Sequence, residues 1–164
     1  MKKIWMAVLL SCLLTPAYAD NPNQQNLDQY ELYQQMEAVQ VYTEDKINEI
    51  MNRKLDTLSP EQRRRLDTGQ LDKRAEDEIE QSVQRQFIQS WAGHMNQCYE
   101  RNAARLCAYR DMYFHQLYEP GLRRLGHQFL PLHAQTRAWM RQNPRLSEQA
   151  EDEISKVIRL INTW

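Results

Sequence analysis

The fold is decided by the stretch Phe87–Phe114, which reads FIQSWAGHMNQCYERNAARLCAYRDMYF and contains Cys98 and Cys107. On one unbroken α-helix, two residues nine positions apart are separated by about 13 Å along the axis. A disulfide needs Cα atoms within about 7 Å of each other. The two cysteines can therefore pair only if the chain turns back between them. Asn102 is a suitable turning point, because asparagine tolerates the left-handed conformation that often ends a helix.

We therefore predict a helical hairpin whose arms are joined near its tip by a Cys98–Cys107 disulfide. Closing such a short loop stabilises a protein by about 2–3 kcal/mol. The alternative is one long helix that carries two free or intermolecular thiols. Because an oxidising compartment favours the disulfide, the location of the protein bears on this choice.

The N-terminus predicts export. Lys2 and Lys3 precede an apolar run at 4–14, and Ala17-Tyr18-Ala19 supplies the small residues of a cleavage site. Residues 1–19 therefore read as a cleavable signal peptide that delivers the protein to the periplasm. The alternative is a lipoprotein, since Leu9-Leu10-Ser11-Cys12 resembles a lipobox that would make Cys12 the lipid-bearing N-terminus. The cleavage site after Ala19 is the better formed of the two.

The mature chain is weakly acidic. Removing 19 of the 164 residues leaves 145, with 19 Lys and Arg against 22 Asp and Glu. This balance, together with export, argues against a nucleic-acid partner. No further segment is long and apolar enough to span a membrane. Residues 20–26 are polar and predict a disordered leader, and 27–164 predict a single helical domain.

Composition and periodicity favour an all-α fold. Glycine is scarce, with four residues, and no segment sustains the alternation of apolar and polar residues that a strand requires. We predict a small bundle of four to six helices. The expected helices are 27–55, 58–66, 70–101, 103–118, 132–142 and 147–164, with a short segment at 122–130. Glu119-Pro120-Gly121 is expected to end the fourth helix, and Ser147 to cap the last.

Two of these helices carry distinctive apolar patterns. In the first, Leu32, Met36 and Val39 lie on one face, and we expect three tyrosines to widen that face. These tyrosines are Tyr30, Tyr33 and Tyr42. In the longest helix, apolar residues recur at every fourth position from Leu71 to Met95. Because the α-helix has 3.6 residues per turn, this line winds around it. The helix should therefore cross its partners obliquely, or contact different partners at its two ends.

The segment Leu58-Ser59-Pro60-Glu61-Gln62 contains the clearest helix start. Ser59 is placed to be the N-cap, Pro60 is at the first helical position, and Gln62 completes a capping box. The same five residues resemble the LTxxQ motif of periplasmic stress chaperones, with Ser in place of Thr. That resemblance implies a small all-α protein that binds unfolded clients. The family usually carries the motif twice, whereas the second candidate here, Leu146-Ser147-Glu148-Gln149, is one residue too short.

Motifs for catalysis are missing. The sequence has no nucleophile elbow, HExxH, phosphate loop, CxxC or CxxCH. We therefore expect no enzyme, no catalytic residues and no cofactor. A metal site could be imagined from His94, Cys98, Cys107 and His115, but the last two are two turns apart on one helix, so we expect no metal. His127 and His133 are expected to be ordinary surface or turn residues.

These observations favour a non-enzymatic periplasmic protein-binding factor, chaperone-like or related to envelope stress. Its partner would be an envelope protein or an unfolded client. Tyr99, Tyr109 and Tyr113 are the candidate partner-binding residues, on the condition that they are exposed. The alternative is an accessory or minor pilin-like subunit of a secretion or conjugation apparatus, which is also exported and helical.

Overall fold

A computed structural model describes residues 27–124 and 131–163, and within these ranges the chain forms six helices and no strand. The predicted all-α bundle is therefore confirmed. The helices are α2 (Leu27–Asp56), α3 (Pro60–Asp67), α4 (Lys73–Arg101), α5 (Ala104–Arg124), α6 (Ala134–Gln142) and α7 (Pro144–Asn162). The predicted signal peptide at 1–19, the leader at 20–26, the alternative lipid site at Cys12, and His127 lie outside the described residues.

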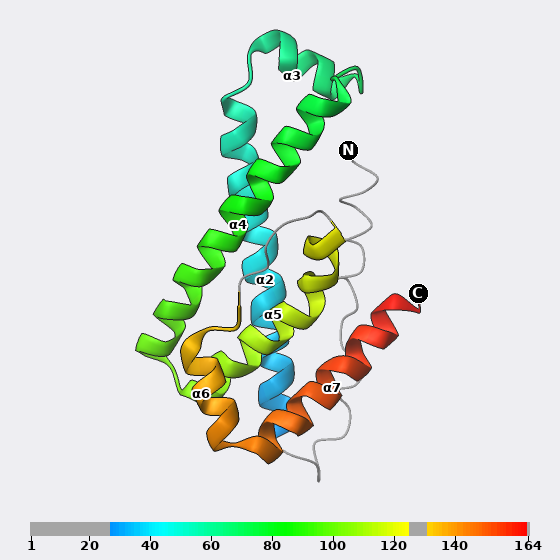
Figure 1. Cartoon of the computed structure of the whole chain (residues 1–164). Coiled ribbons are helices and arrows are strands. Elements are labelled where there is room, and N and C mark those ends of the chain that lie inside the picture. The colour runs from blue at the N-terminus through cyan, green and yellow to red at the C-terminus, as the bar shows by residue number, and fades with distance from the viewer. Residues whose placement is uncertain (1–26, 125–130, 164) are drawn as a thin grey trace.

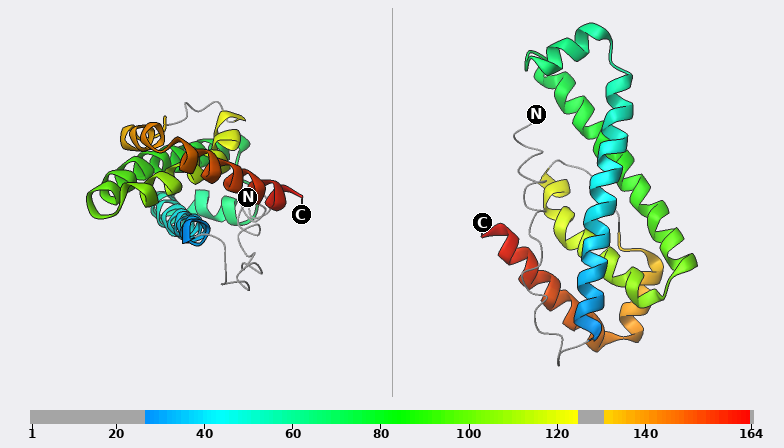
Figure 2. Two further views of the ribbon diagram at one scale, coloured as in Figure 1. Left: turned by 90° about the horizontal axis from the view of Figure 1, so that it is seen from below. Right: turned by 180° about the vertical axis from the view of Figure 1, so that it is seen from behind.

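The molecule is elongated. Helices α2 and α4 run along its length and are joined at one end by α3, while α5, α6 and α7 gather around the other half (Figure 1). The view from behind shows α2 crossing in front of α4 and α5 (Figure 2). We call residues 51–78 the tip, and we call α5, α6, α7 and the parts of α2 and α4 packed on them the core bundle. No residue of the tip is buried.

The predicted hairpin is formed by α4 and α5. Cys98 and Cys107 are joined by a disulfide, with their Cα atoms 5.8 Å apart. Asn102 lies at the turn, but its φ of −128° is extended, so the expected left-handed conformation was wrong. The residue ends α4 by hydrogen bonding instead. Its backbone N–H and its side-chain amide both donate to the Cys98 carbonyl, at 2.8 and 3.2 Å, which satisfies a carbonyl that the helix end leaves open.

Helix α5 lies at the centre of the core bundle and contacts α2, α4, α6 and α7. Its middle is buried on almost every side, as expected for a helix with apolar residues all round. The buried apolar residues of α5 are Cys107, Ala108, Tyr109, Met112, Tyr113 and Phe114. Trp91 of α4 stacks on Phe114 with ring centroids 4.0 Å apart.

The winding apolar line of α4 is confirmed as a packing surface. It contributes Ile79, Val83, Phe87, Trp91 and Met95 to the buried residues, and the helix contacts both α2 and α5. Phe87 packs on Phe114 and Tyr118 of α5, and Trp91 contacts Tyr42 of α2 as well as Phe114. The line therefore packs against two partner helices.

Two of the predicted helix boundaries that were wrong involve proline. Helix α5 does not stop before Pro120 but continues through it to Arg124. A proline removes one backbone hydrogen bond from a helix, and Pro120 is exposed, so its ring does not disturb the packed side. Helix α7 begins at Pro144 rather than at Ser147, because proline suits the first helical position. Ser147 is buried, and its N–H donates to the Asn143 carbonyl at 3.0 Å.

Helix α3 begins with the capping box that the sequence predicts. Gln62 N–H donates to Ser59 Oγ at 3.2 Å, and Ser59 N–H donates to Gln62 Oε1 at 2.9 Å. Gly69, with φ +68°, follows α3 in the left-handed region that favours glycine. Over the part of the chain that the structure describes, no helix combines the length and the apolar character needed to cross a bilayer.

Candidate protein-binding surface

Exposed apolar side chains concentrate on the outward side of α2. Among the described residues, four large hydrophobic side chains are exposed, and three of them lie on this helix: Tyr30 at 64%, Tyr33 at 36% and Val41 at 54%. Glu37 and Glu44 are exposed between and beyond them. Residues spaced three or four apart share one side of a helix. We call these five residues the outer face of α2.

The position of the tyrosines corrects a prediction. Tyr30, Tyr33 and Tyr42 were expected to widen the apolar face of the first helix, but only Tyr42 does so. It packs against the core, while Tyr30 and Tyr33 lie on the opposite side. The error arose because α2 carries apolar residues on two sides, and sequence periodicity does not say which side the rest of the molecule covers.

Polar contacts fix the rotation of α2 about its axis. On its inner side, Arg110 Nε donates to Gln35 Oε1 at 2.6 Å, and Gln40 Nε2 donates to the Tyr113 hydroxyl at 2.9 Å. Further along, the Tyr42 hydroxyl donates to the Ser90 carbonyl at 3.0 Å. These directional contacts add to the burial of Val39 and Ile50, and together they hold the outer face toward solvent.

The outer face is acidic. Residues 27–45 contain five carboxylates and neither lysine nor arginine. Glu31 is engaged inward in an ion pair with Arg105 of α5. Glu37 and Glu44 are exposed, and within residues 27–124 and 131–163 they form no ion pair. The exposed apolar side chains of this face thus share it with two carboxylates that are available to a cationic partner.

The three tyrosines predicted as contact residues lie elsewhere. Tyr109 and Tyr113 are buried, at 2% and 0% exposure, so they do not meet the condition of exposure. Tyr99 is half-buried, and its hydroxyl forms a 2.7 Å hydrogen bond with Thr136 of α6. Burial raises the pKa of Tyr99 to about 12, although the Thr136 hydrogen bond works in the opposite direction. All three tyrosines join helices rather than forming a surface.

A buried carboxylate that no sequence motif marks lies at the centre of the core bundle. Asp111 of α5 is 1% exposed, and it accepts hydrogen bonds from Trp91 Nε1 at 3.1 Å and from the His133 backbone N–H at 2.8 Å. His115 Nε2 lies 3.4 Å from the same carboxylate. Burial opposes ionisation of Asp111, but these partners outweigh burial and hold its pKa below the ordinary value. The carboxylate ties α4, α5 and the start of α6 together.

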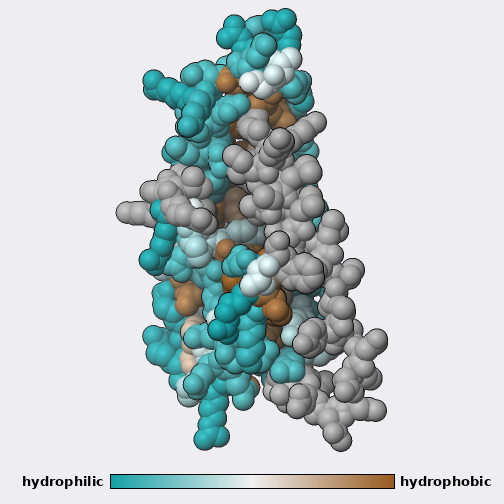
Figure 3. All heavy atoms as spheres, turned by 90° about the vertical axis from the view of Figure 1, so that its right-hand side faces the viewer, coloured by the Kyte–Doolittle hydropathy of each residue, from teal (hydrophilic) through white to brown (hydrophobic). Residues whose placement is uncertain are grey.

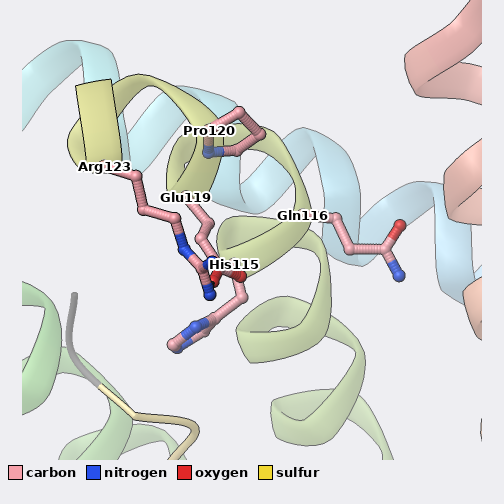
Figure 4. Close-up of a pocket in the computed structure, with 5 residues that line it drawn as sticks. All are labelled: His115, Gln116, Glu119, Pro120 and Arg123. Carbon is pink, nitrogen blue, oxygen red and sulfur yellow. Dashed lines mark hydrogen bonds and ion pairs between the residues drawn. The ribbon is translucent and has the colours of Figure 1, made fainter.

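The neighbouring hollow on α5 has little capacity for chemistry. It measures about 320 Å³, opens to solvent, and is lined by His115, Gln116, Glu119, Pro120 and Arg123. Figure 4 shows Arg123 reaching toward Glu119 above His115, while Gln116 points away. The Glu119–Arg123 ion pair occupies the charges of both residues, and Gln116 accepts a hydrogen bond from Ser155 at 3.2 Å. A nucleophile and an oxyanion site, which acyl transfer would need, are not assembled by these five residues.

His94 of α4 faces α2, near the positively charged side chains of Arg110 and Lys46. Its ring stacks on Tyr42 with centroids 3.9 Å apart. Burial, followed by the positive charges of Arg110 and Lys46, lowers the pKa of His94 to about 4. Its Nε2 is buried and has no hydrogen-bond partner among the described residues. The ring is therefore neutral at physiological pH and acts as an aromatic spacer between the two helices.

The residues considered for a metal site are separated by their own contacts. The two cysteines are oxidised to the disulfide, and a disulfide offers no thiolate ligand. His94 stacks on Tyr42, and His115 pairs with Asp111. In the described ranges, no group of three or more His, Cys, Asp or Glu side chains is placed to share an ion.

The remaining surface is mostly hydrophilic. On the side of the molecule shown in Figure 3, hydrophobic residues appear as small separate areas among hydrophilic ones. The fourth exposed hydrophobic side chain of the described residues is Leu160 of α7, at 54% exposure. It lines a hollow with Lys156, Arg159 and Thr163.

No family model, curated protein or solved structure matches this chain.

Proposed function

We propose that this chain is an exported, non-enzymatic protein-binding factor of the periplasm, chaperone-like or related to envelope stress. The observation that carries the proposal is the outer face of α2. Tyrosine offers a large apolar ring with a polar end, and aromatic residues on a rigid element are typical of the residues that dominate binding energy at protein interfaces. Tyr30, Tyr33 and Val41 supply such side chains on one helix.

The construction of the core bundle supports this use. A binding surface held on a rigid scaffold loses less conformational freedom on association than a mobile one does. The disulfide, the Asp111 hydrogen bonds and the contacts of Gln35 and Gln40 fix the helices on which α2 rests. The partner would then meet a preformed helix face rather than a loop that must become ordered.

The proposal is tested by the aggregation of a chemically denatured client protein, followed by light scattering. The wild-type protein is expected to slow aggregation, and Tyr30→Ser/Val41→Ser is expected to lose most of that effect because it removes apolar contact area. Leu160→Ser is the matched control, since Leu160 and Val41 are both 54% exposed and lie on different helices. Wild-type protein that does not slow aggregation, or equal losses in the two variants, would contradict the proposal.

A further inference from the structure

The charges of this chain are segregated along the sequence. Residues 27–45, which form most of the core-bundle part of α2, contain five carboxylates and no lysine or arginine. Residues 120–147 contain five arginines and neither aspartate nor glutamate. The net charge of the whole chain is −1, so the separation leaves two regions of opposite sign on a nearly neutral protein.

The basic region presents a defined surface. Arg137 and Arg141 are exposed on α6, and Arg145 is exposed in the first turn of α7. We call these three residues the arginine surface. Thr136 and Trp139, at 0% and 7% exposure, hold the other side of α6 in the core. Within residues 27–124 and 131–163, Arg141 and Arg145 form no ion pair, so their guanidinium groups are available to an anionic partner.

The outer face of α2 and the arginine surface belong to opposite sides of one molecule. In the view from below, α2 lies at one side and α6 at the other, and the view from behind presents α2 nearest the reader (Figure 2). The two surfaces are carried by helices of one rigid bundle, since both α2 and α6 pack on α5. Their charges therefore cannot neutralise each other within a single copy of the chain.

We infer that the outer face of α2 also binds the arginine surface of a second copy of this chain. The inference rests on the proposed protein-binding role of that face, and it adds a second partner that would compete with a client for it. Glu37 and Glu44 supply carboxylates that arginine binds with paired hydrogen bonds. Tyr30 supplies an aromatic ring on which a guanidinium can stack. Complementary potentials of this kind steer association and fix the orientation of the partners.

Such a contact is heterologous, because it joins two different surfaces. Each copy that has docked its outer face keeps its own arginine surface free, so assembly continues until a ring closes or a chain of copies extends. An isologous dimer would instead bury the same surface on both copies and stop at two. Assembly through exposed charges is also expected to weaken as salt rises, since salt screens such pairs.

Sedimentation-velocity experiments on the full-length purified protein test the inference. The wild-type protein is expected to associate beyond a dimer as its concentration rises at low salt, and to dissociate in high salt. Glu37→Arg/Glu44→Arg and Arg141→Glu/Arg145→Glu are each expected to weaken association by at least about tenfold. Asp67→Arg/Asp77→Arg is the matched control for the first variant, because it makes the same change in net charge at exposed residues of the tip, and it is expected to associate like the wild type.

Mixing the two interface variants gives the decisive measurement. The Glu37→Arg/Glu44→Arg variant keeps an intact arginine surface, and the Arg141→Glu/Arg145→Glu variant keeps an intact outer face of α2. Together they are expected to recover association beyond a dimer, because the two unaltered surfaces pair and the two reversed surfaces are again opposite in charge. Wild-type protein that stays monomeric, interface variants that associate as the wild type does, or a mixture that stays monomeric would overturn the inference. The client-aggregation assay with Tyr30→Ser/Val41→Ser is read separately, so loss of the self-contact is distinguishable from failure of the proposed function.

Discussion

The core bundle and the tip are built from the same long helices but are held together by different forces. In the core bundle, Trp91, Tyr113, Phe114 and Ile154 are almost completely removed from solvent. In the tip, at residues 51–78, no side chain is buried. The outer face of α2 and the arginine surface both belong to the core bundle. The part of the molecule with the proposed binding surfaces is thus also the part that packing makes rigid.

The tip depends on local interactions instead. Most of its ion pairs join neighbours on one helix, as in Glu61 with Arg65 at 2.8 Å and Arg74 with Glu78 at 3.2 Å. Arg63 of α3 also pairs with Asp56, the last residue of α2, at 3.6 Å. Exposed pairs of this kind contribute about 0–1 kcal/mol each. Burying a large apolar side chain contributes more, about 1.5–3 kcal/mol. We therefore expect the tip to open in local fluctuations that leave the core bundle folded.

The largest expected effect is the loss of Trp91. Its ring stacks on Phe114 and its Nε1–H donates to the buried Asp111. Trp91→Ala is expected to lower the free energy of unfolding by about 3–5 kcal/mol or more, because it opens a cavity and deprives a buried carboxylate of a donor. Urea unfolding followed by circular dichroism measures the change.

Two further variants separate the causes. Trp91→Phe keeps an aromatic ring but removes the donor, and it is expected to cost about 1–3 kcal/mol. Leu66→Ala, at a half-buried position of the tip, is expected to cost about 1 kcal/mol or less. If Leu66→Ala lowers the free energy of global unfolding as much as Trp91→Ala does, the proposed difference between the two regions is wrong.

The disulfide gives the next largest effect. Cys98 and Cys107 close a loop with a sequence separation of 9 residues, and removing the link by Cys98→Ala/Cys107→Ala is expected to cost about 2–3 kcal/mol. Reduction of the wild-type protein should produce a similar loss, whereas the reductant should leave the variant unchanged. Unfolding curves with and without reductant measure both. Equal stability in all four samples would show that helix packing alone holds the hairpin.

The hairpin illustrates how much of the fold the sequence determines. Covalent geometry showed that two cysteines nine residues apart can pair only across a turn, and the predicted export favoured that pairing over one long helix. The capping box at Ser59 and the winding line of α4 followed from local rules in the same way. Pro120 and Ser147 did not, because α5 carries Pro120 on its exposed side, and Pro144, three residues before Ser147, already suits the start of α7. The local rules placed the turn at Asn102, where the structure has it, but they predicted the wrong backbone conformation for that residue.

The candidate site was much harder to predict. Tyr109 and Tyr113 resemble contact residues in the sequence, yet α5 lies between four other helices, which no local pattern reveals. Tyr30 and Tyr33 looked like core residues for the opposite reason. For Asp111 only the neighbour His115, four residues on, could be read from the sequence, because its other partners, Trp91 and His133, are 20 and 22 residues away. Which side of a helix is covered depends on contacts between distant segments.

His94 should give the core bundle a distinct pH dependence. Its pKa is about 4 in the folded protein against about 6.5 in an unfolded chain, so the unfolded state binds more protons between these values. The contribution of His94 to the free energy of unfolding is therefore fully present above about pH 6.5 and is lost as the pH drops toward 4. For this half-buried group we expect a loss of about 1–2 kcal/mol over that range.

The comparison that isolates this effect is His94→Gln, measured by urea unfolding at several pH values. The variant lacks the titrating ring, so its stability should change less than that of the wild type between pH 6.5 and 4. Asp111 contributes in a lower range, because its depressed pKa costs stability only as the pH falls below its unfolded value of about 3.9. Parallel pH profiles for wild type and variant between pH 6.5 and 4 would contradict the assignment to His94.

The smallest expected effect on the whole molecule comes from Ser59, and it examines the tip directly. Ser59→Ala removes one half of the capping box, which weakens a helix start by about 1 kcal/mol. Because α3 has no buried residue, this loss should appear as faster hydrogen exchange of the α3 amides, with little change in global unfolding. Amides of α5 serve as the internal control, since that helix lies in the core. Exchange that rises equally in α3 and α5 would mean that the tip and the core bundle open together as one cooperative unit.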